Sequence, residues 1–479
     1  MYAPGLRERL KRRRKRRALR REREEEELAS AAFLYLALSD EEWDELNEAK
    51  LNAGSKKGKK NIIRQRKEVE SMFAELGNKA RRSYRMSIES FLHLHDILEE
   101  DLKAYFSRSS TAADGDDGDR AGAPNGRVPT KLRLSAAIRF FAGGDASDLV
   151  LTHGMGYSTL YESVWGVVDV INHSKHPHLQ FNEDGASFPS HEEQREIAEA
   201  FERMSGAGFD NVIGAVDGML VWTIKPPKKV CDAMDIGQMA YHCYRKDKYG
   251  VILLAICDDK TRFRWIDIRC PGRSSDYLAW LMSTLPDQLD DEEKEIVLEG
   301  MTIVGDNAFV ENNYMAIPFP GNAIDELQDG YNFYLSQLRI TIERAFGILI
   351  HRWGILRRPL GCHIQTVPAL VQCLCRLHNF CIDHGSMNSI RPSIEDQESI
   401  QRRAWRNGRG LNRKVRRNAV ALDELDCPAP LLGGGHHFKD VEGARRPVGE
   451  DGETPMRSMF QKVKDANLLR PPVRKRGGR

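Results

Sequence analysis

The sequence predicts an α/β fold, because strand patterns alternate with amphipathic helices over its central part. The apolar run Val212–Thr223 has the length and composition of a buried strand. A hairpin pattern follows at residues 250–270, where Asp258–Thr261 forms the turn between two apolar segments. A helix is predicted over Asp276–Leu285 and a short strand over Met301–Val304. This order of elements is typical of α/β proteins.

Long helices are predicted on both sides of these strands. Ser190 followed by Glu193 forms a capping-box signature, which opens a helix running to about Met204. A second helix is predicted after Asn332 and a third, largely apolar one over Val367–Cys381. The buried stripe of the second helix consists of Leu338, Ile342, Ala345, Phe346 and Leu349.

The chain before the strands divides into several regions. Residues 61–106 have helical spacing of apolar side chains, and residues 107–127 form a linker by composition. Residues 128–185 then predict three helices. Thr130 can cap the first, which runs to Phe141, Asp145 can cap the second, and Ser158 opens the third after a turn at Gly154. A tight turn between helices is typical of helix-turn-helix DNA-binding regions, and also of ordinary helical bundles. If the region reads DNA, the first turn of its third helix places Ser158, Thr159 and Tyr161 nearest the bases.

The charge of the chain is concentrated at its ends. The formal net charge is only +2 over 479 residues, but Arg7–Arg23 contains twelve Lys or Arg. More basic residues gather between Arg402 and Arg417. We therefore expect a disordered basic arm at residues 1–60 and a disordered basic tail at 386–479. Such segments are typical of nuclear localisation or nucleic-acid contacts, or are simply solvated, and we expect a nuclear protein.

Cysteine usage and hydropathy argue against a secreted or membrane protein. The nine cysteines form no disulfide framework, and no apolar run has the length that a membrane span needs. One group has metal-like spacing, and it could bind zinc or pack in the core. Cys373 and Cys375 would point about 200° apart on a helix, which favours the core. The group consists of Cys373, Cys375, His378 and Cys381.

Three acidic residues stand in similar settings. Asp217 lies within the apolar strand pattern beside Gly218, and a buried carboxylate must be paired, protonated or bound to a cation. Asp306 follows the strand Met301–Val304, and Glu343 lies on the helix after Asn332. Carboxylate oxygens of this kind suit magnesium and the chemistry of two-metal phosphoryl transfer. Glu343 could instead form an ordinary i,i+4 pair with Arg339.

These positions carry a resemblance to a known family. The sequence resembles the Harbinger/PIF-type transposases and the nucleases derived from them, which carry a DDE superfamily endonuclease domain. The likeness covers about residues 128–385. The main motifs are Gly214, Asp217 and Gly218, then Gly305 and Asp306, then Ile342–Gly347; further matches are Phe188–Ser190, Ala255–Asp259, Pro271, Gly272, Asp276 and Leu377–Asn379.

The resemblance implies an RNase H-like catalytic domain with a mixed sheet at residues 186–385. It implies that Asp217, Asp306 and Glu343 hold Mg²⁺, with Mn²⁺ able to substitute, and hydrolyse phosphodiester bonds in DNA. Arg339 and Arg344 are then expected to contact the DNA backbone or to orient the glutamate. Asp276 matches an acidic family position, to which we assign a structural or auxiliary role. The chain departs from the family pattern at Met219, Leu220, Phe309 and Val310.

Two functions follow from this resemblance. The first is a metal-dependent DNA endonuclease or transposase, and the second is a domesticated DNA- or chromatin-binding protein that no longer cuts. The intact acidic triad favours the enzyme. An unrelated serine or cysteine hydrolase is disfavoured because no nucleophile-elbow motif surrounds any serine. By analogy with the family, we expect DNA, a separately encoded Myb-like DNA-binding protein and a second copy of the chain as partners.

Overall fold

The computed structural model describes residues 64–108, 127–179, 188–289, 296–321, 324–384 and 454–471. The predicted basic arm at 1–60 lies outside the described residues, as do most of the linker at 107–127 and most of the tail at 386–479. No described helix is long and apolar enough to cross a membrane.

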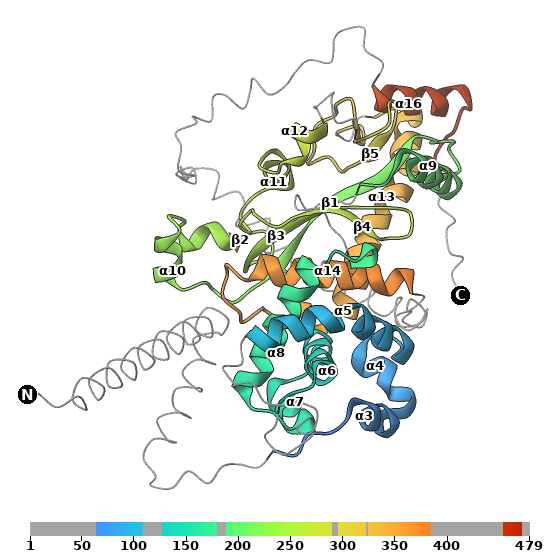
Figure 1. Cartoon of the computed structure of the whole chain (residues 1–479). Helices are drawn as coiled ribbons and strands as arrows, with labels where there is room; N and C mark the ends of the chain where they lie inside the picture. The colour runs from blue at the N-terminus through green and yellow to red at the C-terminus, as the bar shows by residue number, and fades with distance from the viewer. Residues whose placement is uncertain are drawn as a thin grey trace, which may run out of the picture.

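A mixed six-stranded sheet forms the centre of the molecule (Figure 1). Its strands follow the order β2-β3-β1-β5-β6, and β4 pairs with the far end of β3. The pairs β1–β3, β2–β3 and β3–β4 are antiparallel, whereas β1–β5 and β5–β6 are parallel. The strands are β1 (Val212–Trp222), β2 (His242–Cys243), β3 (Lys248–Cys257), β4 (Phe263–Asp267), β5 (Thr302–Val304) and β6 (Met315–Ala316).

Both faces of the sheet are buried, which explains why its central strands are apolar without alternation. In β3, Leu253 and Ala255 face the larger core, while Leu254 and Ile256 face the smaller one. The larger core contains side chains of α13 and α14, and the smaller one contains side chains of α11 and α12. The helices around the sheet are α9 (His191–Ser205), α10 (Lys228–Ala233), α11 (Asp276–Leu281), α12 (Leu285–Leu289), α13 (Glu326–Arg352) and α14 (Val367–Asp383).

Local signals fix where these helices begin and end. The Ser190 side chain accepts a hydrogen bond from the Glu193 amide at 3.3 Å, and Gly206 ends α9 in the left-handed conformation. Helix α13 begins before the predicted Asn332, because Asp325 and Gln328 form a complete capping box. Four short 3₁₀ helices complete the described elements: η1 (Gly77–Lys79), η2 (Pro177–Leu179), η3 (Gln238–Tyr241) and η4 (Gly354–Arg357).

A helical lobe packs against the sheet domain and shares its larger core. The helix predicted to run to Phe141 is confirmed, but Thr130 is its first residue and Pro129 is at the cap position. Asp145 caps the next helix as expected. The third helix begins at Tyr157 rather than after Ser158, with Gly156 at the cap position. The lobe consists of α3 (Val69–Leu76), α4 (Ala80–Tyr84), α5 (Ile88–Arg108), α6 (Thr130–Phe141), α7 (Ala146–His153) and α8 (Tyr157–His173).

The expectation of an entirely irregular C-terminal tail is wrong for residues 454–471, which contain helix α16 (Pro455–Asp465). Met459 and Val463 on this helix are fully buried, and the Phe460 ring contacts Phe319 at 4.7 Å between centroids. The apolar stripe has helical spacing, but it spans only three turns between segments rich in Gly, Pro and charge. Helix α16 packs on α13 and so belongs to the same fold.

Strand β1 has an open stretch along one edge. On this side β5 pairs with β1 only as far as Ala215. Beyond the stretch, the Leu360 amide donates to the Trp222 carbonyl at 2.8 Å and the Ile224 amide donates to the Leu360 carbonyl at 3.1 Å. Residues 216–221 therefore have no strand partner on this edge within the described part of the chain. Side chains from neighbouring elements can approach β1 there.

Candidate active site

Asp217 lies in the open stretch of β1, opposite Ala255 of β3. Its Oδ1 atom accepts a hydrogen bond from the Gly218 amide at 2.8 Å. Burial raises the pKa of Asp217 to about 6, and the negative charges of Asp276 and Asp306 act in the same direction. The Gly218 hydrogen bond and the positive charge of Arg339 oppose this rise in pKa. Asp217 is thus a half-buried carboxylate surrounded mainly by like charge.

Asp306 lies two residues after β5, at the end of the open stretch. Its Oδ1 atom accepts from the Ala308 amide at 2.8 Å, so the side chain closes its own turn. The preceding Gly305 is tightly enclosed: a Cβ atom there would lie 2.9 Å from a Phe309 ring carbon and 3.2 Å from Val216 Cγ1. This packing holds the Asp306 turn against the residue that precedes Asp217.

Asp276 reaches the same stretch from the first turn of α11. The Ser275 hydroxyl caps this helix by accepting from the Leu278 amide at 3.1 Å. A Cβ atom built on Gly218 would overlap the Asp276 carboxylate and lie 2.6 Å from its Cγ atom. Burial raises the pKa of Asp276, the charge of Arg245 opposes the rise, and that of Asp306 adds to it. From the resemblance we predicted only a structural or auxiliary role for this residue, yet it is a close neighbour of β1.

Glu343 pairs with Arg339 in the structure. It lies on α13 with its side chain 59% exposed, and its Oε1 atom is 4.0 Å from Arg339 Nη2. Arg339 lies one turn earlier, and its positive charge lowers the pKa of Asp217. Among the described residues, no three His, Cys, Asp or Glu side chains are placed to hold a metal ion. Asp217, Asp276 and Asp306 lie near one another without forming a closed ligand set.

The donor chemistry of this region nevertheless suits a hard cation. All the acidic side chains present carboxylate oxygens, which Mg²⁺ and Mn²⁺ prefer as ligands. The pKa of Asp217 is raised in part by its acidic neighbours, so a bound cation would relieve their repulsion. The Nε atom of Arg339 is buried without a hydrogen-bond partner in the described structure, and the positive charge of this residue acts on Asp217.

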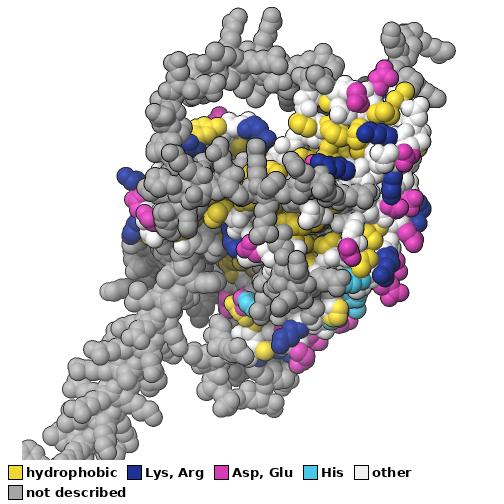
Figure 2. Space-filling model, turned by 90° about the horizontal axis from the view of Figure 1, so that it is seen from above, with side chains coloured by type: hydrophobic (Ala, Val, Ile, Leu, Met, Phe, Trp, Pro, Cys, Tyr) yellow, Lys and Arg dark blue, Asp and Glu magenta, His cyan; other side chains and the backbone are white. Residues whose placement is uncertain are grey.

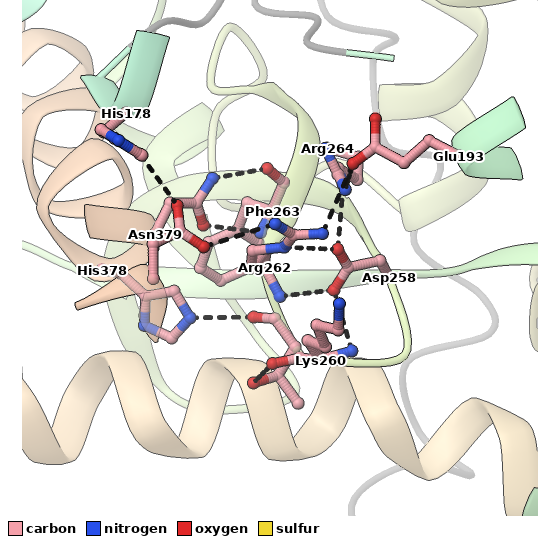
Figure 3. Close-up of polar contacts among 11 residues, drawn as sticks. His178, Glu193, Asp258, Lys260, Arg262, Phe263, Arg264, His378 and Asn379 are labelled. Atoms are coloured by element: carbon pink, nitrogen blue, oxygen red, sulfur yellow. Dashed lines mark hydrogen bonds and ion pairs between the residues drawn. The ribbon is translucent and has the colours of Figure 1, made fainter. Parts of the chain in front are cut away.

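A buried polar network fixes the β3–β4 turn beside the site (Figure 3). Asp258 is fully buried, and its Oδ2 atom accepts from Arg262 Nε at 2.8 Å and Arg264 Nε at 2.9 Å. Arg264 also donates to Glu193 of α9 at 2.5 Å. The amide of Asn379 on α14 bonds both the N–H and the carbonyl of Phe263, at 2.8 Å each. The network thus joins the hairpin to α9 and α14.

The cysteine group on α14 belongs to the core, as the helix geometry favoured. Cys373, Cys375 and Cys381 are fully buried among apolar side chains. Burial raises the pKa of each of these thiols. The Nε2 atom of His378 lies 2.9 Å from the Thr261 carbonyl, to which its N–H donates, so this nitrogen is already engaged.

The predicted DNA-contacting residues have different surroundings. Arg344 is exposed on α13, as is Ser158 on α8, and Thr159 is half-buried. Tyr161 does not face a groove as expected: it is 7% exposed and its ring packs edge-on against Phe140 at 6.0 Å. Helix α8 is buried along most of its length, because it packs on α5, α6 and α14. This burial leaves mainly its first turn available for a partner.

Comparison with known proteins identifies the central part of this region. Residues 216–379 match the family model of the DDE superfamily endonucleases. The match begins one residue before Asp217, ends at Asn379 and includes Asp276, Asp306 and Glu343. No curated protein and no solved structure matched the chain. The match supports a nuclease or transposase function, which agrees with the acidic residues gathered at the open stretch of β1.

Proposed function

We propose that the protein is a metal-dependent DNA endonuclease of the DDE type, related to the Harbinger/PIF transposases, that hydrolyses phosphodiester bonds. The observation that carries this proposal is the approach of Asp306 to Asp217 at the open stretch of β1, within the segment that matches the DDE endonucleases. The antiparallel pairs β1–β3 and β3–β4, with the parallel strands β5 and β6 on the other side of β1, support an RNase H-like assignment for the domain.

Asp217 and Asp306 would hold the divalent metal, with Glu343 as the third carboxylate. When bound, such a metal lowers the pKa of water and stabilises the charge that develops on a phosphate. Glu343 is exposed and held only by the 4.0 Å pair with Arg339, so a rotation of its long side chain costs little. Arg339 would be freed by this rotation. Its unpartnered Nε–H would then face the region where the DNA phosphate binds.

Nicking of supercoiled plasmid tests the proposal. The full chain is incubated with Mg²⁺ or Mn²⁺ and compared with Asp217→Asn and with the surface control Asp101→Asn, at an exposed position on α5. We expect nicking by the natural protein and the control, and at least a hundredfold loss in Asp217→Asn. Equal nicking by all three proteins would point to a contaminating nuclease or another site, and would overturn the assignment.

The position of Glu343 favours a second candidate function, a domesticated DNA- or chromatin-binding protein that no longer cuts. Among the described residues, no group of three His, Cys, Asp or Glu side chains is placed to hold a metal ion, and Glu343 is paired with Arg339. Retained DNA binding with no nicking under any divalent metal would support this second function over the first.

Partners and localisation are further parts of the proposal. DNA is the substrate or ligand in both functions. A separately encoded Myb-like protein is proposed as a DNA-binding partner, since α8 offers only its first turn for contact. A homodimer would allow two DNA ends to be paired. The basic segment Arg7–Arg23 supports a nuclear location.

A further inference from the structure

Aromatic and basic side chains gather at the turn between β2 and β3, residues Tyr244–Asp247. Tyr244 is 59% exposed, although two neighbours hold its ring. The guanidinium carbon of Arg273 lies 5.3 Å from the ring centroid, and the His242 ring packs edge-on against it at 4.9 Å. Arg245 and Lys246 on the same turn are exposed. A large aromatic ring that is fixed in place and still exposed to solvent can stack against another planar group.

The loop that precedes α11, residues 271–275, connects this turn with the candidate active site. The Arg273 amide donates to the Ala240 carbonyl at 2.9 Å, and the Gly272 amide donates to the Gly250 carbonyl at 2.8 Å. Three residues after Arg273 the chain reaches Asp276, whose carboxylate lies against Gly218 of β1. The positive charges of Arg245 and Lys246 also act on Asp276, where they lower its pKa against the effect of burial.

Two further cation–π pairs lie near this turn, at the end of β1 and the start of β3. The Lys248 ammonium lies 3.0 Å from the Trp222 ring centroid, and that of Lys225 lies 5.9 Å from Tyr249. These lysines approach rings at the end of β1 and the start of β3. On the face visible in Figure 2, Lys and Arg are interspersed with Asp and Glu.

We propose that Tyr244, Arg245, Lys246 and Arg273 form a strand grip, which holds an unpaired stretch of DNA beside the phosphate to be cut. The inference rests on the proposed function and names the part of the substrate that the site binds. Aromatic rings stack on the flat face of any base, and neighbouring cations bind the phosphates without reading sequence. Duplex DNA hides its base faces, so the grip favours a strand that has left the duplex.

Binding of fluorescent oligonucleotides to the full chain, in EDTA so that no cutting occurs, tests the strand grip. One probe is a blunt duplex, and the other is the same duplex with a single-stranded extension. The variants are Tyr244→Ala, Tyr244→Phe and the double variant Arg245→Ala/Lys246→Ala. The control Lys103→Ala/Arg203→Ala removes the same charge from exposed positions on α5 and α9.

We expect Tyr244→Ala to bind the extended probe about tenfold more weakly, while its affinity for the blunt duplex is unchanged. Tyr244→Phe keeps the ring and is expected to bind like the natural protein. The Arg245→Ala/Lys246→Ala variant should lower the slope of log affinity against log salt by about 1.5, unlike its control. Equal binding of the extended probe by Tyr244→Ala and the natural protein would overturn the strand grip. Equal losses on both probes would overturn the stacking of an unpaired base.

The binding experiment tests the strand grip separately from the nuclease activity, because binding is measured in EDTA and nicking is measured with a divalent metal. Loss of binding in Tyr244→Ala, in a chain that never nicks plasmid, would support the strand grip and reject the nuclease. Nicking by the natural protein, with unchanged binding in Tyr244→Ala, would support the nuclease and reject the strand grip.

Discussion

The carboxylate of Asp276 occupies the space that a side chain at Gly218 would need. A Cβ atom at Gly218 would overlap this carboxylate and lie 2.6 Å from its Cγ atom. Gly218 does not have a positive φ angle, so the backbone conformation does not require glycine there. The close approach of α11 to the open stretch of β1 requires it instead. The two residues therefore set the position of one acid beside Asp217.

The first prediction concerns Gly218→Ala. The added methyl group must displace Asp276, and a strained contact of this kind costs about 1–3 kcal/mol of the free energy of unfolding. We expect both this loss, measured by urea denaturation, and a strong loss of plasmid nicking. Gly237→Ala is the control, because a Cβ atom at Gly237 meets nothing within 4 Å.

A double variant separates the clash from other effects of the methyl group. In an Asp276→Ala background only the Cβ atom of residue 276 remains, 3.4 Å from the added methyl, which is ordinary contact. Gly218→Ala should then cost less than 1 kcal/mol. An equal cost in both backgrounds would show that Asp276 is not what excludes a side chain at Gly218.

The second prediction concerns Glu343→Gln. Its side chain is 59% exposed and lies 4.0 Å from Arg339, so the substitution should change the free energy of unfolding by less than about 0.5 kcal/mol. As the third metal ligand, however, Glu343 should be needed for cutting, and we expect at least a hundredfold loss of nicking. Glu326→Gln on the first turn of the same helix serves as the control. A variant that nicks at the natural rate would exclude Glu343 from the triad.

Local sequence signals were sufficient to predict much of the fold. The strand at Val212, the capped helix after Ser190 and the helix at Thr130 all depend on neighbouring residues, through apolar spacing and side-chain caps. The pairing of Glu343 with Arg339 was also open to prediction, since both lie on one helix at i,i+4 spacing.

The remaining features depend on contacts between distant segments. The approach of Asp276 to Gly218 follows from how α11 packs on the smaller core, which no local pattern reveals. Tyr161 was predicted to face DNA, but α8 is enclosed by three other helices and the ring joins their core. Helix α16 was missed because its short apolar stripe is buried only by packing against α13, which is distant in the sequence.

The third prediction concerns the buried acid of the network, Asp258→Asn. This substitution leaves Arg262 and Arg264 facing a neutral side chain in a buried setting, where loss of one partner costs about 3 kcal/mol or more. We expect this loss in urea denaturation. Glu75→Gln breaks an exposed pair with Lys67 and should cost less than 1 kcal/mol. Similar costs for the two variants would mean that the network contributes little to stability.

The fourth prediction concerns pH, through the buried His153. Its Nε2 atom lies 3.1 Å from the Ser135 hydroxyl, which in turn lies 2.7 Å from the Tyr84 hydroxyl. Burial, with a smaller effect from Arg139, lowers the pKa of His153 to about 4. The unfolded chain, with a histidine pKa near 6.5, therefore binds a proton that the folded chain rejects between these two values. His153 thus makes the protein less stable as pH falls from about 6.5 to 4.

For this one group the loss between pH 7 and pH 5 is about 2 kcal/mol of the free energy of unfolding. His153→Gln, which cannot titrate, should lose correspondingly less stability over this range, as measured by urea denaturation at the two pH values. Other groups titrate in both proteins, so the difference between the two losses isolates His153. His173→Gln, at an exposed position on α8, should behave like the natural protein. Identical losses in the natural protein and His153→Gln would show that His153 accepts its proton in the folded state at an ordinary pKa.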